Sequence, residues 1–155
     1  MPRMAARYML SEYWDGFLPV DPTVIARAAQ VTVEHDPDLG DAFGRFEFLD
    51  GRPHIYTNPN EPEMRQRFTI AHELGHFMLD HGDWFVDTAD EFATVQLDAI
   101  ERQANIFALE LLIPGFAVEI LIEKRNIGSF ETLREMFGVT EIALEHKLKR
   151  LGWAP

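Results

Sequence analysis

Residues 68–76 constrain this chain more than any other segment, because they combine a helical pattern with side chains that can bind a metal ion. His72 and His76 are four residues apart, and Glu73 directly follows the first histidine. On an α-helix, residues at this spacing lie on one face and can reach a single ion. The pattern H-E-x-x-H is typical of zinc-dependent hydrolases, in which the histidines bind zinc and the glutamate accepts a proton from water.

The surroundings of the motif favour metal binding over two ordinary core histidines. Apolar residues repeat at helical spacing and predict a largely buried helix over residues 61–79: Phe68, Ala71, Leu74 and Met78. Buried polar groups need partners, and a metal ion is one. Gly75 inside this helix should cost about 1 kcal/mol relative to alanine, which predicts close approach of a strand or of substrate there.

A third ligand is expected from a later helix, predicted over residues 97–112. The metzincin continuation requires a histidine six residues after His76, where Gly82 stands, and His81 falls on the wrong face or past the helix end. Glu101 and Asn105 share one face of the later helix with small residues that allow close packing. We expect Glu101 to be a ligand and Asn105 to orient a ligand imidazole. The alternative is that Glu101 only stabilises the helix start through the macrodipole.

The remaining pattern predicts an α+β fold: a mainly helical zinc-peptidase domain with a small antiparallel sheet, of about three strands, packed on the metal-binding helix. Strands are expected at 31–34, 42–49 and 54–57, with a hairpin turn at Asp50-Gly51 and a twist or bulge at Gly44. Further helices are expected at 3–13, 22–30, 116–125, 130–137 and 141–151, with Asp21, Ser129 and Thr140 as N-caps. The polar segment 80–96 is interpreted as a solvated loop, with a flexible lid as the alternative.

Length and hydrophobic content indicate a single domain over residues 1–155. Its C-terminal part, 129–151, has the pattern of a helix-turn-helix. The basic residues there are balanced by as many acidic ones, which predicts weak phosphate affinity and favours packing over DNA binding.

Composition excludes several classes of protein. The absence of cysteine excludes disulfides, cysteine nucleophiles and cysteine-bound zinc. A net charge of −12 repels phosphate backbones, so no direct nucleic-acid partner is expected. No apolar run approaches the length of a membrane span and the N-terminus lacks a signal-peptide core, so we expect a cytoplasmic protein with no membrane partner.

Three blocks of sequence resemble the ImmA/IrrE family of metallopeptidase domains: PVDP at 19–22, RFTIAHELGH at 67–76 and ERQANIFALELLIP at 101–114. The resemblance implies His72, His76 and Glu101 as metal ligands and Glu73 as the catalytic acid/base. It implies Zn²⁺ as cofactor, with Mn²⁺ as the alternative.

The resemblance also implies a biological setting in bacteria, phages or mobile elements. Such proteins cleave a helix-turn-helix repressor of the XRE type, encoded nearby, and so derepress genes. Some relatives are paired with such regulators in toxin–antitoxin-like modules. The alternative function is a binding module that sequesters a DNA-binding partner without cutting it, against which the intact Glu73 argues.

The residue that stabilises the oxyanion stays open at this point. Peptide hydrolysis needs a hydrogen-bond donor for the developing negative charge. Tyr56, His81 and His54 are the candidates.

Overall fold

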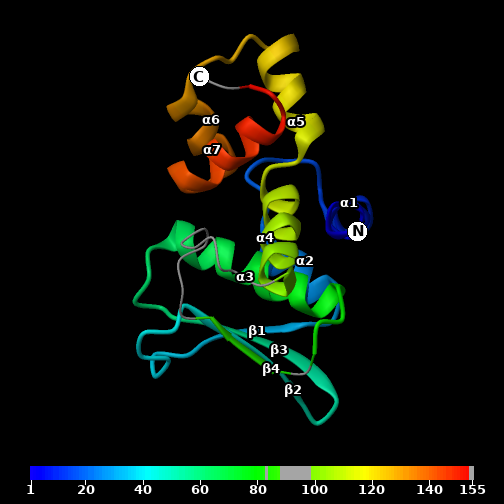
Figure 1. The fold of residues 1–155 in the computed structure, drawn as a ribbon, viewed down its shortest axis with the longest axis vertical. Coiled ribbons are helices and arrows are strands. Elements are labelled where there is room, and N and C mark those ends of the chain that lie inside the picture. Colours follow the sequence, from blue (N-terminus) through cyan, green and yellow to red (C-terminus); the bar gives the residue numbers. More distant parts are fainter. Residues whose placement is uncertain (83, 88–98, 154–155) are drawn as a thin grey trace.

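The computed structural model describes residues 1–82, 84–87 and 99–153, with only the backbone described at 84–87. Its mainly helical architecture, with one small sheet, confirms the predicted α+β class (Figure 1). The helices in chain order are α1 (Pro2–Tyr13), α2 (Pro22–Ala28), α3 (Glu63–Met78), α4 (Ala99–Leu112), α5 (Gly115–Glu119), the π-helical turn η1 (Ile120–Lys124), α6 (Phe130–Phe137) and α7 (Glu141–Arg150).

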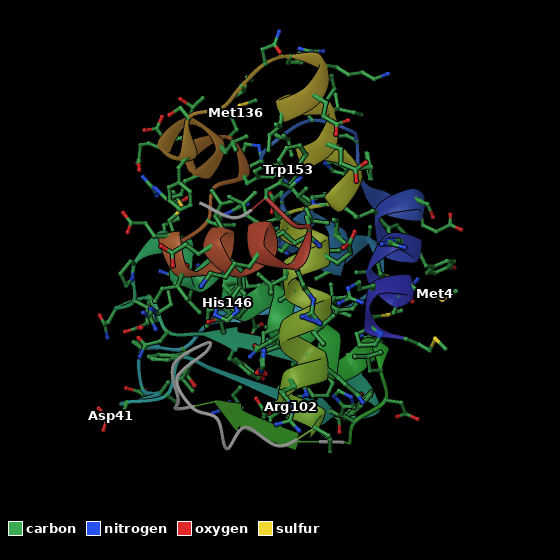
Figure 2. All side chains as sticks on the ribbon, turned by 45° about the horizontal axis from the view of Figure 1, so that its top comes forward. Met4, Asp41, Arg102, Met136, His146 and Trp153 are labelled. Atoms are coloured by element: carbon green, nitrogen blue, oxygen red, sulfur yellow. The ribbon has the colours of Figure 1, made fainter. Side chains whose placement is uncertain are left out.

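The sheet lies at one end of the molecule and the C-terminal helices at the other, with α4 running between them (Figure 1). Arg102 near the start of α4 lies at the sheet end, whereas Met136 and Trp153 lie among the C-terminal helices (Figure 2). A continuous core joins the two ends and includes Phe46, Phe107 and Phe137, all fully buried. The polar motif residues on α3 are therefore held in a packed interior.

The sheet has four strands in the order β1-β3-β2-β4, one more than expected. They are β1 (Thr32–His35), β2 (Gly44–Leu49), β3 (Arg52–Thr57) and β4 (Trp84–Asp87). The β2–β3 hairpin is antiparallel as predicted, whereas β1 pairs with β3 in parallel. β2 also pairs with the unexpected β4, in antiparallel orientation. β4 lies inside the segment 80–96 that was interpreted as loop or lid, and residues 88–98 of that region lie outside the described residues.

The connection between β1 and β2 explains the parallel pair. His35 and Gly44 both stand opposite Thr57, so β1 ends and β2 begins at the same end of β3, on its two sides. The chain from 36 to 43 passes over the end of β3, where the Asn58 side chain donates to the carbonyls of Gly40 and Ala42, both at 3.1 Å. A short strand cannot reveal from its own residues which neighbour it will pair with, so the sequence did not predict this crossing.

α3 lies between the sheet and α4, and glycines on its two sides permit the close packing. A Cβ on Gly44 would come within 2.3 Å of the Thr69 side chain and 3.7 Å of the Glu73 side chain. A Cβ on Gly75 would come within 3.1 Å of the Phe107 ring. The close neighbour of Gly75 is thus α4 and not a strand. Gly44 begins β2 in regular register with β3 and does not form a bulge.

The C-terminal helices begin where the sequence predicted, because their caps form. Ser129 accepts a hydrogen bond from the Thr132 amide and Thr140 accepts one from the Ala143 amide. The predicted helix 116–125 instead divides into α5 and η1. α6 and α7 bury Leu133 and Leu144 in the core, as expected for packing helices.

No single helix in the described part of the chain is long and apolar enough to cross a membrane. One pair, α4 followed by α5 and η1, meets such a test only when its two parts are joined across a bend of 45°.

Candidate metal centre

α3 brings the three motif residues together in the interior. His72 is 7% exposed, and Glu73 and His76 are fully buried. Their ligand-capable atoms all lie within 4.8 Å of one another, and the two imidazole rings meet edge to face with centroids 4.7 Å apart. The i, i+4 spacing on a regular helix therefore has the geometric effect that the sequence predicted.

α4 adds the carboxylate of Glu101 to these residues. One Glu101 oxygen lies 3.0 Å from His72 Nε2 and the other lies 3.0 Å from His76 Nε2. The two Nε2 atoms are 3.2 Å apart. We call His72, Glu73, His76 and Glu101 the metal cluster. Close packing of α4 on α3 at Gly75 and Phe107 makes this meeting of side chains from two helices sterically feasible.

Asn105 determines which nitrogen of His72 carries the proton. Its side-chain oxygen lies 2.7 Å from His72 Nδ1, and Asn105 is itself buried, at 6% exposed. An amide oxygen only accepts hydrogen bonds, so a neutral His72 ring donates from Nδ1 and keeps a lone pair on Nε2. The predicted pairing of Asn105 with a histidine of the motif is present, one helical turn after Glu101.

The spacing of the converging atoms fits a metal ion. Ligands that bind zinc tetrahedrally at about 2.0–2.1 Å lie roughly 3.3 Å from one another. The two Nε2 atoms of His72 and His76 lie 3.2 Å apart, and each lies 3.0 Å from a different oxygen of the Glu101 carboxylate. Two imidazole nitrogens and one carboxylate are also a donor set common in catalytic zinc sites. The residues present therefore fit a divalent cation.

Glu73 differs from the other three residues of the metal cluster in its hydrogen bonding. Both of its carboxylate oxygens are buried and have no hydrogen-bond partner among the described residues. A buried carboxylate without a partner carries a large desolvation cost, and proteins retain such groups mainly at functional sites. Glu73 is thus placed to act on a molecule that enters the cluster.

Burial favours the neutral form of His76. Burial lowers the pKa of His76, and the neighbouring Glu101 carboxylate acts in the opposite direction. A neutral imidazole is the form that binds a metal ion. The interior position of His76 therefore favours the binding-competent form at neutral pH.

Tyr56 and His54 lie on the opposite face of the sheet from the metal cluster. Phe46 stands opposite Ile55 in the β2–β3 pair and contacts Phe77 of α3, so this face is the inner one. Successive residues of a strand point to opposite faces, which turns Tyr56 outward, where Arg45 lies 4.3 Å from its ring. Their positions do not support either residue as an oxyanion donor, because strand alternation directs them away from the site.

His81 lies past the end of α3, one of the two positions expected for it, and from there it reaches the cluster. Its Nδ1 lies 3.0 Å from His76 Nδ1, and its Nε2 lies 2.9 Å from the side-chain oxygen of Gln103. Sequence reasoning did not single out Gln103. Nothing in its local pattern marks it, because its contact with His81 exists only once α3 and α4 have packed.

Comparison with known proteins places most of the chain in one family. The family model described as the IrrE N-terminal-like domain matches residues 26–149. Metallopeptidase ImmA of Bacillus subtilis is 30% identical over 115 residues, which are 74% of this chain and 68% of that protein. The radiation response metalloprotease IrrE of Deinococcus deserti is 35% identical over 72 residues, 45% of this chain and 26% of that protein.

Two further comparisons extend this result. An immunity region protein of Bacillus phage phi105, of uncharacterised function, is 32% identical over 75 residues, covering 48% of this chain and 47% of that protein. Among solved structures, a transcriptional regulator of Mycobacterium tuberculosis superposes with a TM-score of 0.65 at 20% identity, covering 96% of this chain and 46% of the regulator. At that identity the structural match supports the fold alone.

Proposed function

This chain belongs to the ImmA/IrrE family of metallo-endopeptidases, and on that premise we propose that it uses zinc to cleave a partner transcriptional repressor of the helix-turn-helix type. His72, His76 and Glu101 would hold the ion, and Glu73 would act as the catalytic acid/base. The family match over residues 26–149 supports a divalent metal, and the donor set favours zinc, with manganese as the alternative.

The observation that carries the proposal is the convergence of three electron-pair donors on one point. The two imidazole Nε2 atoms and the Glu101 carboxylate lie 3.0 to 3.2 Å apart in the protein interior. His72 holds its proton on Nδ1 through Asn105, so its Nε2 directs a lone pair toward the other donors. Lone pairs facing one another repel, and a cation between them removes the repulsion.

Glu73 has the properties that the proton transfer requires. A zinc ion held at this site would act as a Lewis acid and would lower the pKa of the water bound to it toward neutrality. Glu73 accepts the proton of the attacking water and returns it to the leaving amine of the cut peptide. Its carboxylate has no competing hydrogen bond among the described residues, so it is available for both transfers. A module that only binds a partner has no use for a buried carboxylate of this kind.

The identity of the substrate is supported by relatives instead of by geometry. The chain is 30% identical to a protein named as a metallopeptidase and 32% identical to a phage immunity-region protein. The repressor itself is what the family resemblance implies. The substrate proposed here is a small helix-turn-helix regulator encoded beside this chain.

The test is a cleavage assay with that neighbouring regulator. The zinc-loaded wild-type protein should cut it at a defined bond, and Glu73→Gln should keep zinc while the rate falls roughly 10²–10⁴-fold. Glu63→Gln, on the exposed first turn of α3, is the matched control and should cut normally. Cleavage at the wild-type rate by Glu73→Gln would remove Glu73 as the acid/base. An uncut regulator in the presence of zinc-loaded protein would remove it as the substrate.

A further inference from the structure

Two residues outside the H-E-x-x-H motif, His81 and Gln103, connect His76 to the protein surface through hydrogen bonds. His76 Nδ1 contacts His81 Nδ1 at 3.0 Å, and His81 Nε2 contacts the Gln103 side-chain oxygen at 2.9 Å. His76 is fully buried, His81 is half-buried and Gln103 is exposed. The three residues come from α3, from the turn that follows it, and from α4.

The end of α3 explains how His81 returns to His76. The helix ends at Met78, and Asp80 adopts a left-handed conformation with a φ of 55°. The Asp80 amide donates to the Phe77 carbonyl at 3.1 Å and the His81 amide donates to the His76 carbonyl at 3.0 Å. These are the two hydrogen bonds of a Schellman motif, which reverses the chain at a helix end. A residue five positions after His76, which a continued helix would carry to another face, is therefore folded back onto it.

The direction of each proton follows from the acceptor at the surface end. The Gln103 oxygen only accepts, so His81 donates from Nε2, and a neutral His81 ring then has a lone pair on Nδ1. That lone pair accepts the proton of His76 Nδ1. His76 consequently keeps its own lone pair on Nε2, the atom that faces Glu101 at 3.0 Å.

We propose that His81 is a positioning residue and not a metal ligand: together with Gln103 it holds His76 in the tautomer that presents Nε2 to the metal ion. The inference rests on the metal site of the proposed function and does not depend on the substrate. In this proposal two residues of α4 orient the ligand histidines: Asn105 contacts His72 directly, and Gln103 acts on His76 through His81.

The first experiment measures zinc affinity by competition with a chromophoric chelator. Loss of a hydrogen-bond partner outside the ligand set typically lowers metal affinity 10- to 100-fold, so His81→Ala should weaken zinc binding by about that factor. Gln103→Leu should weaken it in the same direction by less, because His81 stays in place. His81→Gln retains an acceptor oxygen and should recover part of the loss. Zinc affinity within twofold of wild type for His81→Ala would overturn the proposal.

Two matched controls separate this effect from general loss of a polar side chain. His35→Ala removes an exposed histidine whose Nδ1 contacts the Thr57 hydroxyl at 2.9 Å. Gln66→Leu removes a glutamine that donates to the Glu61 carbonyl at 2.8 Å. Both should leave zinc affinity unchanged. Weakening in these controls as large as in His81→Ala would also overturn the proposal.

The second experiment reads the tautomers by long-range ¹H–¹⁵N NMR of the zinc-loaded protein. His76 should show a proton on Nδ1 and zinc on Nε2, and His81 should show a proton on Nε2 with no zinc-bound nitrogen. A zinc-bound nitrogen in His81 would make it a ligand and overturn the proposal. Neither experiment uses substrate, so failure to cut the regulator would leave this inference intact, and an unaltered site in His81→Ala would leave the proposed function intact.

Discussion

Two clusters of polar side chains lie at opposite ends of α4. They differ in the source of the positive charge that balances their carboxylates. At the sheet end is the metal cluster, in which Glu101 of α4 meets His72 and His76. At the other end is an ion-pair cluster, which we define as Arg7, Glu110 and Lys147. The same helix thus carries one half-buried carboxylate, Glu101, at the candidate active site and one buried carboxylate, Glu110, in the packed core.

The ion-pair cluster is satisfied by the protein itself. Glu110, only 2% exposed, forms a short ion pair with the equally buried Lys147 of α7. It also accepts hydrogen bonds from Arg7 of α1 at 3.4 Å and from the Gly115 amide at 3.3 Å. Burial lowers the pKa of Lys147, and the adjacent Glu110 carboxylate opposes this shift. The cluster links α1, α4, α5 and α7.

The metal cluster lacks such internal compensation at Glu73, whose oxygens have no partner among the described residues. The comparison teaches that burial alone does not distinguish a structural carboxylate, Glu110, from the carboxylate proposed to be catalytic, Glu73. What distinguishes them is whether the fold provides a cation. Changes in the ion-pair cluster should alter stability without altering zinc affinity, and changes in the metal cluster should do the reverse.

The largest expected effect is that of Lys147→Met. Removing Lys147 leaves the buried Glu110 with only its longer contacts to Arg7 and the Gly115 amide, which should lower the free energy of unfolding by about 3–5 kcal/mol. The double variant Glu110→Leu/Lys147→Met, which removes both charges, should return close to the wild-type value. Urea unfolding of the metal-free protein measures both, and a loss in the double variant as large as in the single one would show that packing, and not charge, is at stake.

Glu101→Ala should have the largest effect on the metal cluster. Loss of a ligand should weaken zinc binding by more than the roughly 100-fold limit typical of residues outside the ligand set. The unfolding free energy of the metal-free protein should change by less than in Lys147→Met. Zinc titration and urea unfolding test the two statements, and unchanged zinc affinity would remove Glu101 from the ligand set.

Asn105→Ala should have an intermediate effect, about 10- to 100-fold on zinc affinity, because His72 loses the acceptor that places its proton on Nδ1. Asn105→Asp keeps an acceptor oxygen at the same position and should bind zinc about as well as wild type. The same chelator competition measures both variants. Equal losses in the two would show that the acceptor oxygen is not what Asn105 contributes to zinc binding.

The smallest effect concerns the stability of Glu73→Gln in the metal-free protein. A buried carboxylate without a partner is replaced by a neutral side chain of similar shape, which relieves the desolvation cost of the charge, so the unfolding free energy should rise, by about 1 kcal/mol. Thermal unfolding measures this difference. A loss as large as that of Lys147→Met would show that Glu73 has a structural partner like that of Glu110.

The sequence was sufficient where a contact depends on residues close together in the chain. His72 and His76 share a face because of helical spacing, and the caps of α6 and α7 form because Ser129 and Thr140 accept from amides three residues ahead. Glu101 and Asn105 could be paired with the motif because helical spacing places both on one face of α4 beside small residues. These inferences need only local geometry and one helix-to-helix contact.

The sequence was insufficient where a contact depends on how distant segments meet. The parallel β1–β3 pair, the fourth strand and the outward direction of Tyr56 all follow from sheet order and register, which the residues of one strand do not encode. The π-helical turn η1 likewise carried no recognisable signal.

By itself, then, the sequence determined the chemistry of this protein: two histidines and a glutamate on a buried helix, with a third ligand expected one helix later. Only the tertiary structure decided how that chemistry is supported. The packing of α4 on α3 sets the two Nε2 atoms and the Glu101 carboxylate oxygens that face them 3.0 to 3.2 Å apart, and the reversal after Met78 brings His81 back to His76. The physical reason is that spacing along a helix follows from covalent geometry, whereas the distance between two helices follows from the side chains packed between them, here Gly75 against Phe107.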